Sequence, residues 1–340
     1  MVSWNNSAKV LWDPVVTETF RGGLNESSQN SELWFMTLRN WHLQLFLIPA
    51  AIFTTLTLTI NPLLLISITS SRSLRQETRY ILLANTLLAD VLFLVLNLSI
   101  SICNMTGQQL RKQLCEVLIA ATVTAYCGGV MTITFMVVDT YVAVRWPLHY
   151  QNLLPTSRTK KILAGVWILA ALYPTTVVII LETLDVSSQR RQRVCLMLMT
   201  LGSGSLGDAM IIGVHTYFSL GVVLCSSLIL YCYIHLYFVT KTAGIWQSRY
   251  SRARVTLLAH AVMLLLYFGP GLVFAVELIL FHHPSVSMDV RVWVNITNFN
   301  LLMLLPRACF PYLYGLRYRE ISDTLRGLFH RRKMSQIRAA

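Results

Sequence analysis

Charge is scarce in this sequence. Asp, Glu, Lys and Arg together make up 13% of its 340 residues, whereas a soluble domain typically contains about 25%. Hydrophobic residues reach 55%, and the mean hydropathy is +0.56. This composition excludes an ordinary soluble globular protein and indicates an integral membrane protein.

Enzyme signatures are also missing. The sequence has no His-Glu-x-x-His motif, no nucleophile elbow and no paired carboxylates within its apolar stretches. Its seven cysteines fit neither a zinc ribbon nor a redox Cys-x-x-Cys pair. We therefore expect no enzymatic activity, no metal site and no cofactor. Residues 1–41 also lack the short apolar core of a cleavable signal peptide, so we expect the first apolar helix to direct membrane insertion.

Seven long apolar stretches are present. Each has the roughly 20 residues that a membrane-spanning helix needs. They cover residues 42–69, 79–103, 115–144, 161–181, 209–239, 255–281 and 292–314. The loops between them are short, so we predict an all-α membrane protein with a seven-transmembrane helix bundle at residues 42–316. Residues 1–41 would form an extracellular tail and residues 317–340 a cytoplasmic one.

The third stretch differs from the others in its small and polar residues. Close helix packing in a membrane favours such residues, because they allow backbones to approach one another. We therefore predict that this helix lies in the middle of the bundle. The residues concerned are Thr122, Thr124, Tyr126, Gly128, Gly129, Thr132 and Thr134.

The positive charge is unevenly distributed across the predicted membrane. Eighteen of the 28 Lys and Arg residues share one side with three acidic residues, whereas nine share the other side with ten acidic residues. Excess Lys and Arg mark cytosolic loops, so we predict a cytosolic carboxyl terminus and an extracellular amino terminus. The net charge of +13 is thereby explained by topology, and no nucleic-acid partner is expected.

Glycosylation sequons fit the same orientation. Asn5, Asn25 and Asn104 each begin an Asn-x-Ser/Thr triplet on the predicted extracellular side. The two cysteines on that side, Cys115 and Cys195, lie in an oxidising compartment under this topology. We predict that they form a disulfide bond.

Asp90 is an ionisable residue inside the second stretch, and Asn61 lies at a similar depth in the first. Charged groups within a membrane are costly and mark functional candidates. Two interpretations stay open. The pair forms a buried polar clasp between two helices, or Asp90 belongs to a sodium-binding or conformational switch site.

The third stretch ends in a recognisable motif. Asp139, Thr140 and Tyr141 begin the run DTYVAV, and PLHY follows at 147–150. This pattern resembles the D-R-Y-x-A-x…P-L-x-Y signature of rhodopsin-like (class A) G-protein-coupled receptors. Further landmarks of that family occur in order, and together they extend the resemblance over residues 42–330. They are Asn61, Asp90, Trp167, Pro270, Pro311 and Tyr314.

This resemblance implies a function. It indicates a plasma-membrane receptor that transduces an extracellular ligand signal to heterotrimeric G proteins, with a short amphipathic eighth helix after the seventh span. A more distant resemblance to fish-type odorant receptors leaves an odorant-type chemoreceptor as an alternative.

Several positions depart from the family pattern. Thr140 replaces the arginine that pairs with the preceding Asp at rest and contacts the G protein in the active state. Phe268 replaces the toggle tryptophan, and Phe310 replaces the asparagine before Pro311. Gly129 and Pro306 stand where the family's sodium site usually has hydroxyl and amide groups. These departures argue against a sodium site and predict atypical coupling.

The ligand class is narrowed by exclusion. The position of the amine-binding Asp is Thr122, and the position of the retinal-binding lysine is Leu304. The resemblance therefore implies neither a typical amine nor retinal as ligand. The candidate pocket residues are Thr122, Tyr126, Phe268, Gly271 and Asn300.

Two other functions are alternatives to that of a signalling receptor. A transporter or channel would show repeats, broken helices or rows of charge. Arg307 is the only arginine in the interior of a predicted span, and no acidic row accompanies it. A receptor-fold protein with little or no G-protein signalling, acting as a partner of other receptors, stays open because of Thr140.

Overall fold

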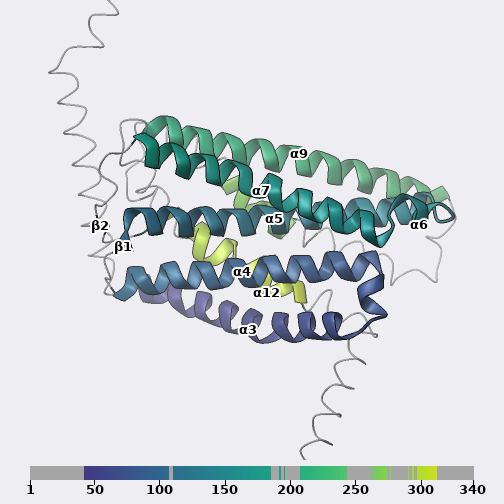
Figure 1. Cartoon of the computed structure of the whole chain (residues 1–340), viewed down its shortest axis with the longest axis horizontal. Helices are drawn as coiled ribbons and strands as arrows, with labels where there is room; N and C mark the ends of the chain where they lie inside the picture. Colours follow the sequence, from purple (N-terminus) through teal and green to yellow (C-terminus); the bar gives the residue numbers. More distant parts are fainter. Residues whose placement is uncertain are drawn as a thin grey trace, which may run out of the picture.

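Long antiparallel helices dominate the computed structural model (Figure 1). It describes residues 42–106, 110–184, 191–192, 195, 207–242, 262, 265–273, 276, 290, 293–294 and 297–311. Within these residues five helices are long and apolar enough to cross a membrane. They are α3 (His42–Ser70), α4 (Thr78–Thr106), α5 (Lys112–Arg145), α7 (Thr156–Leu184) and α9 (Gly207–Thr242).

These helices confirm the first five predicted spans, with longer ends. The largest difference is in α7, which begins at Thr156 rather than at residue 161. Its first turns contain Arg158, Lys160 and Lys161, which are too polar for the membrane interior. Hydropathy marks only the part of a helix within the bilayer, whereas the backbone hydrogen bonds continue beyond it.

Short elements mark the two ends of the bundle. At one end β1 (Leu110–Arg111) pairs antiparallel with β2 (Arg191–Gln192). At the opposite end lie the 3₁₀ turn η1 (Leu74–Gln76) and the single-turn helix α6 (Tyr150–Leu153). We name these the disulfide end and the α6 end.

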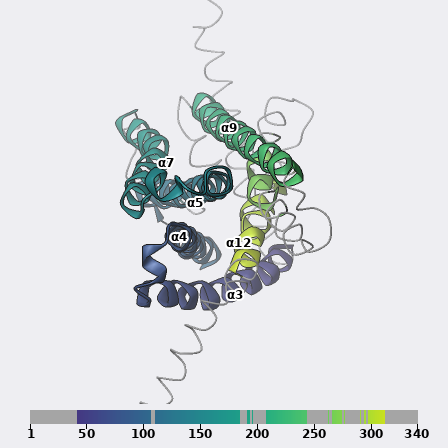
Figure 2. The same cartoon turned by 90° about the vertical axis from the view of Figure 1, so that its right-hand side faces the viewer.

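Helix α5 lies at the centre, as its small residues predict. It packs against α4, α7 and α9, and the end-on view in Figure 2 shows it between them. Gly128 allows α5 to pack closely against α7, because a Cβ atom at this position would lie 3.3 Å from the Trp167 ring of α7. The Trp167 indole donates to Asn85 Oδ1 at 3.0 Å, and Asn85 donates to Thr132 at 2.8 Å. One polar network therefore connects α4, α5 and α7.

The sixth and seventh predicted spans lie partly outside the described residues. Residues 265–273 are helical, and the seventh span includes the π-helical turn η2 (Asn298–Leu302) and α12 (Leu305–Phe310). In η2 the Met303 N–H donates to the Asn298 carbonyl at 2.9 Å. Both η2 and α12 pack against α3. Tyr314, the predicted eighth helix and the two predicted tails fall outside the described residues.

The helix surfaces that face away from the bundle are apolar. Ile168 and Ile179 of α7 and Leu224 of α9 are among the most exposed, at 68%, 61% and 61%. Soluble proteins do not present continuous apolar surfaces of this kind. The exposed surface is therefore suited to contact with lipid.

Candidate functional site

Two opposite charges meet in the middle of the bundle. Asp90 of α4 and Arg307 of α12 are each 0% exposed, and Arg307 Nε lies 3.2 Å from Asp90 Oδ1. This contact is an ion pair without the alignment of a hydrogen bond. The other carboxylate oxygen accepts a hydrogen bond from the Tyr267 hydroxyl at 2.9 Å. Asp90 is thus contacted from both the sixth and seventh predicted spans.

Aromatic rings surround the guanidinium of Arg307. Its Cζ lies 3.8 Å from the ring centroid of Phe93, 5.3 Å from that of Tyr126 and 5.9 Å from that of Tyr267. Its Nη1 also donates to the Met303 carbonyl. A desolvated cation against an aromatic face gains about 2 kcal/mol. We call Asp90, Phe93, Tyr126, Tyr267 and the Met303 carbonyl the cation cage.

The cage connects most of the bundle. The Tyr126 hydroxyl donates to the Tyr267 carbonyl at 3.1 Å, which joins α5 to residues 265–273. The rings of Tyr126 and Phe218 lie 6.2 Å apart, and those of Tyr267 and Phe310 lie 6.0 Å apart. A displacement of any one of these helices therefore has to change the environment of the buried ion pair.

Asn61 differs from its expected role. It is fully buried, yet among the described residues neither atom of its amide group has a hydrogen-bond partner. The hydrogen bond to Asp90 that matching depth suggested is not formed, because Arg307 and Tyr267 occupy the carboxylate. Buried polar groups of this kind usually bind an ordered water molecule.

The sequence identified only half of this site. Asp90 was a candidate, but Arg307 was not recognised as its partner. The depth of Arg307 in the predicted membrane could have indicated a partner, because a charge inside a membrane normally pairs with another charge or with a backbone carbonyl. Arg307 pairs with both.

A second buried aspartate lies at the α6 end. Asp139 of α5 is 6% exposed, and its Oδ1 accepts a hydrogen bond from the Tyr150 hydroxyl of α6 at 2.8 Å. Burial raises the pKa of Tyr150 above its usual value, and the adjacent Asp139 raises it further. The hydroxyl therefore keeps its proton and acts as donor. We call this contact the latch.

Thr140 takes no part in the latch. Its hydroxyl donates to the Met136 carbonyl of its own helix at 2.9 Å. Tyr141 points its ring toward α9, with centroids 6.4 Å from Tyr231 and 6.2 Å from His235. Of the three motif residues, Asp139 thus contacts α6 and Tyr141 contacts α9, whereas the Thr140 hydroxyl bonds within α5.

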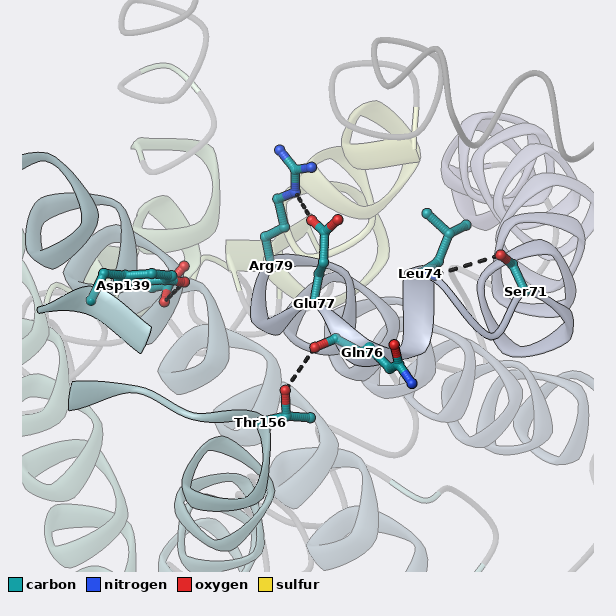
Figure 3. Close-up of polar contacts among 8 residues, drawn as sticks. Ser71, Leu74, Gln76, Glu77, Arg79, Asp139 and Thr156 are labelled. Carbon is teal, nitrogen blue, oxygen red and sulfur yellow. Dashed lines mark hydrogen bonds and ion pairs between the residues drawn. The ribbon is translucent and has the colours of Figure 1, made fainter. Parts of the chain in front are cut away.

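Two more hydrogen bonds join the turns of the α6 end. The Thr78 hydroxyl donates to the Leu154 carbonyl at 3.2 Å, and the Thr156 hydroxyl donates to the Gln76 carbonyl at 2.7 Å (Figure 3). The ion pair between Arg79 and Glu77 is half exposed, so it contributes little.

The predicted disulfide is confirmed at the opposite end. Cys115 of α5 is bonded to Cys195, and their Cα atoms lie 5.7 Å apart. Asn104 of α4 fixes the same loop, because its amide nitrogen donates to the Cys195 carbonyl at 3.0 Å and its oxygen accepts from the Cys195 N–H at 2.7 Å. Glycosylation of Asn104 stays a prediction. Asn5 and Asn25 lie outside the described residues.

An apolar cavity lies between α5, α7 and α9 near the disulfide end. Its walls include Ile119 and Val123 of α5, Val177 and Leu181 of α7, and Phe218 of α9. Glu116 also borders it and is buried, with its carboxylate 3.8 Å from the Lys112 ammonium. The cavity is therefore suited to a hydrophobic group.

The predicted pocket residues lie elsewhere. Thr122 is buried and its hydroxyl donates to the Leu118 carbonyl at 2.7 Å. Phe268, Pro270 and Gly271 are buried in the helix at 265–273. A Cβ atom on Gly271 would collide with Val222 of α9, so this glycine permits close packing. The Asn300 side chain is outside the described residues.

The landmark prolines of the sixth and seventh spans are also buried. Pro270 accepts a hydrogen bond at its carbonyl from the Asn298 amide at 3.2 Å, which joins the sixth and seventh spans. Pro311 directly follows α12 and is buried. Both prolines are therefore buried in the bundle, and Pro270 lies where the sixth span contacts the seventh.

Comparison with known proteins identifies relatives with the same architecture. Residues 60–314 match the family described as 7 transmembrane receptor (rhodopsin family). The human protein described as probable G-protein coupled receptor 148 is 32% identical over 290 residues, which cover 85% of this chain and 84% of that protein.

Proposed function

The chain belongs to the rhodopsin family of seven-transmembrane receptors, and we propose that it transduces the binding of an extracellular ligand into a signal to cytosolic G proteins. The observation that carries this proposal is the family match over residues 60–314. The cavity near one end and the latch at the other give a receptor of this kind the places it needs for ligand and transducer.

The orientation that we propose places the disulfide end outside the cell and the α6 end in the cytosol. A disulfide at Cys115 requires an oxidising compartment. The α6 end contains Arg72, Arg75, Arg145 and Arg158, and Lys and Arg accumulate on the cytosolic side. The plasma membrane is the location that follows for a receptor of an extracellular ligand.

Coupling to the G protein should be weak, because Thr140 supplies no charge. Its hydroxyl is bonded to its own helix, whereas the family's arginine reaches the G protein. A hydrogen bond to a charged group contributes roughly 1.5–3 kcal/mol. Its loss lowers partner affinity by about tenfold to a hundredfold. The latch meanwhile provides a neutral replacement for the family's ionic restraint on Asp139.

The experiment compares wild type with Thr140→Arg, each combined with a constitutively activating change. Second-messenger output is measured at matched surface levels. We expect Thr140→Arg to raise output, and Thr140→Gln, which has a long but uncharged side chain, to leave it near wild type. Equal output from wild type and Thr140→Arg would contradict the proposal and move the G-protein contact to other cytosolic residues.

A second candidate function follows from the same residue. A receptor-fold protein with little signalling of its own would act as a membrane partner of other receptors, and the self-bonded Thr140 hydroxyl favours this role. It predicts that Thr140→Arg does not raise output in any G-protein assay. Proximity labelling in intact cells would then identify co-expressed receptors beside the wild-type chain.

The ligand that we propose is a small molecule other than a typical amine or retinal. The residues that we propose for its pocket are Thr122, Tyr126, Phe268, Gly271 and Asn300, and an apolar cavity lies nearer the disulfide end between α5, α7 and α9. A pocket with mostly apolar lining and few polar groups suits such a ligand.

A further inference from the structure

The cation cage has the components that proteins use to hold a positive charge. It combines a carboxylate, three aromatic rings and a backbone carbonyl, all contacting one guanidinium. Asp90, Arg307 and Tyr267 have no exposed surface. A cation at this depth needs such compensation, because a buried charge without a partner is strongly unfavourable.

A free metal ion does not fit beside this arginine. Asp90 and Arg307 carry opposite unit charges, so their sum is zero, and a sodium ion would add a second positive charge next to the guanidinium. Positions 129 and 306, where the family's sodium site usually has hydroxyl and amide groups, also lack oxygen atoms in their side chains. Gly129 faces the Cβ atom of Ala89, and Pro306 is buried without a polar side-chain atom. Hard cations require several oxygen ligands.

We propose that Arg307 is a tethered cation that permanently occupies this site, so the charge balance of the receptor core is independent of dissolved cations. The cage is selective for a flat organic cation, because the guanidinium carbon lies over its aromatic rings. Removal of the side chain would leave a site for a small guanidinium compound. This inference concerns the core of the bundle and does not depend on the ligand or the G protein.

The experiment measures thermal unfolding of the full-length purified receptor in nanodiscs. Wild type, Arg307→Ala and the control Arg75→Ala, which removes an exposed arginine, are compared in sodium chloride and in choline chloride at equal ionic strength. Each is then titrated with methylguanidinium. Loss of one partner of a buried ion pair lowers the unfolding temperature by roughly 5–10 °C in a domain of this size.

We expect wild type and Arg75→Ala to unfold at the same temperature in sodium and in choline. Arg307→Ala should unfold at a lower temperature, and methylguanidinium at millimolar concentration should restore it in a saturable manner. In a variant that combines Arg307→Ala with Asp90→Asn, methylguanidinium should no longer raise the unfolding temperature. A saturable, Asp90-dependent stabilisation of wild type by sodium would overturn the proposal, as would failure of methylguanidinium to restore Arg307→Ala.

A second set of variants applies if Arg307→Ala does not fold. Asp90→Asn should lower the unfolding temperature, and Asp90→Asn combined with Arg307→Met should be more stable than Asp90→Asn alone, because the double variant leaves no unpaired charge. If the double variant is no more stable than Asp90→Asn, the two residues do not compensate each other and the proposal is wrong.

Discussion

The two ends of this bundle are held together in different ways. At the disulfide end a covalent bond joins Cys115 to Cys195, and Asn104 makes two hydrogen bonds to the backbone of Cys195. At the α6 end the connections that the structure describes are single hydrogen bonds, among them the latch between Tyr150 and Asp139. One end is therefore joined covalently, whereas the other is joined by non-covalent contacts.

The two ends are therefore suited to different tasks. A binding site gains affinity when its walls are already in place, and the bond between Cys115 and Cys195 would serve the proposed ligand site in this way. A coupling surface has to change shape, and a hydrogen bond contributes only about 1 kcal/mol. The α6 end can therefore open at low cost. The predictions below test this comparison.

The largest effect should follow loss of the disulfide. Cys115→Ser or Cys195→Ser removes a bond between residues 80 apart in the sequence. In the chain-entropy model a bond closing a loop of this size stabilises by about 4 kcal/mol. We expect surface expression, measured by flow cytometry, to fall several-fold. Cys225→Ser, which changes a free cysteine, is the control. Unchanged expression of both bridge variants would show that the end is not fixed by this bond.

Asn104 should give the next largest effect. Asn104→Ala removes both hydrogen bonds to Cys195, and we expect a cost of roughly 1–3 kcal/mol with reduced surface expression. Thr106→Ala destroys the same sequon but leaves the Asn104 side chain intact, so it isolates the contribution of a glycan. Similar losses in both variants would assign the effect to glycosylation, and a loss only in Asn104→Ala would assign it to the hydrogen bonds.

A smaller effect is expected at the latch. Tyr150→Phe removes one hydrogen bond, so it should reduce stability by about 1 kcal/mol and favour the open form of the α6 end. Asp139→Ala should have a similar effect. The double variant should be no worse than either single one, because both remove the same contact. Additive losses in thermal unfolding would show that the two residues act separately.

The smallest effects should come from the exposed contacts of the α6 end. Thr156→Val removes the hydrogen bond to Gln76, and Arg79→Ala removes a half-exposed ion pair. Each should change the free energy of unfolding by less than about 1 kcal/mol. A loss from Arg79→Ala larger than that from Tyr150→Phe would reverse the order of importance that the burial of these contacts implies.

The sequence predicted the parts of this structure that depend on local pattern. Apolar length identified the five described spanning helices, and the small residues of α5 identified its central position. Asp90 was recognised as important from its depth in an apolar stretch, and Asp139 from the motif that it begins. Their partners were not recognised. Arg307 is distant from Asp90 in the sequence, and Tyr150 approaches Asp139 only because α6 folds back beneath α5, so both contacts depend on the tertiary arrangement.

The π-helical turn η2 has a consequence for the position of Arg307. A turn of this kind holds one more residue than an α-helical turn, and each residue rotates a helix by about 100°. The side chains that follow Met303 are therefore directed differently than an uninterrupted helix would direct them. Arg307 faces Asp90 only with the helix rotation that the π-helical turn produces. Deletion of a single residue within Asn298–Leu302 would leave every cage residue in the chain but rotate the guanidinium away from the Asp90 carboxylate. The register of the seventh span, and not composition alone, therefore determines whether the charges in the core are paired.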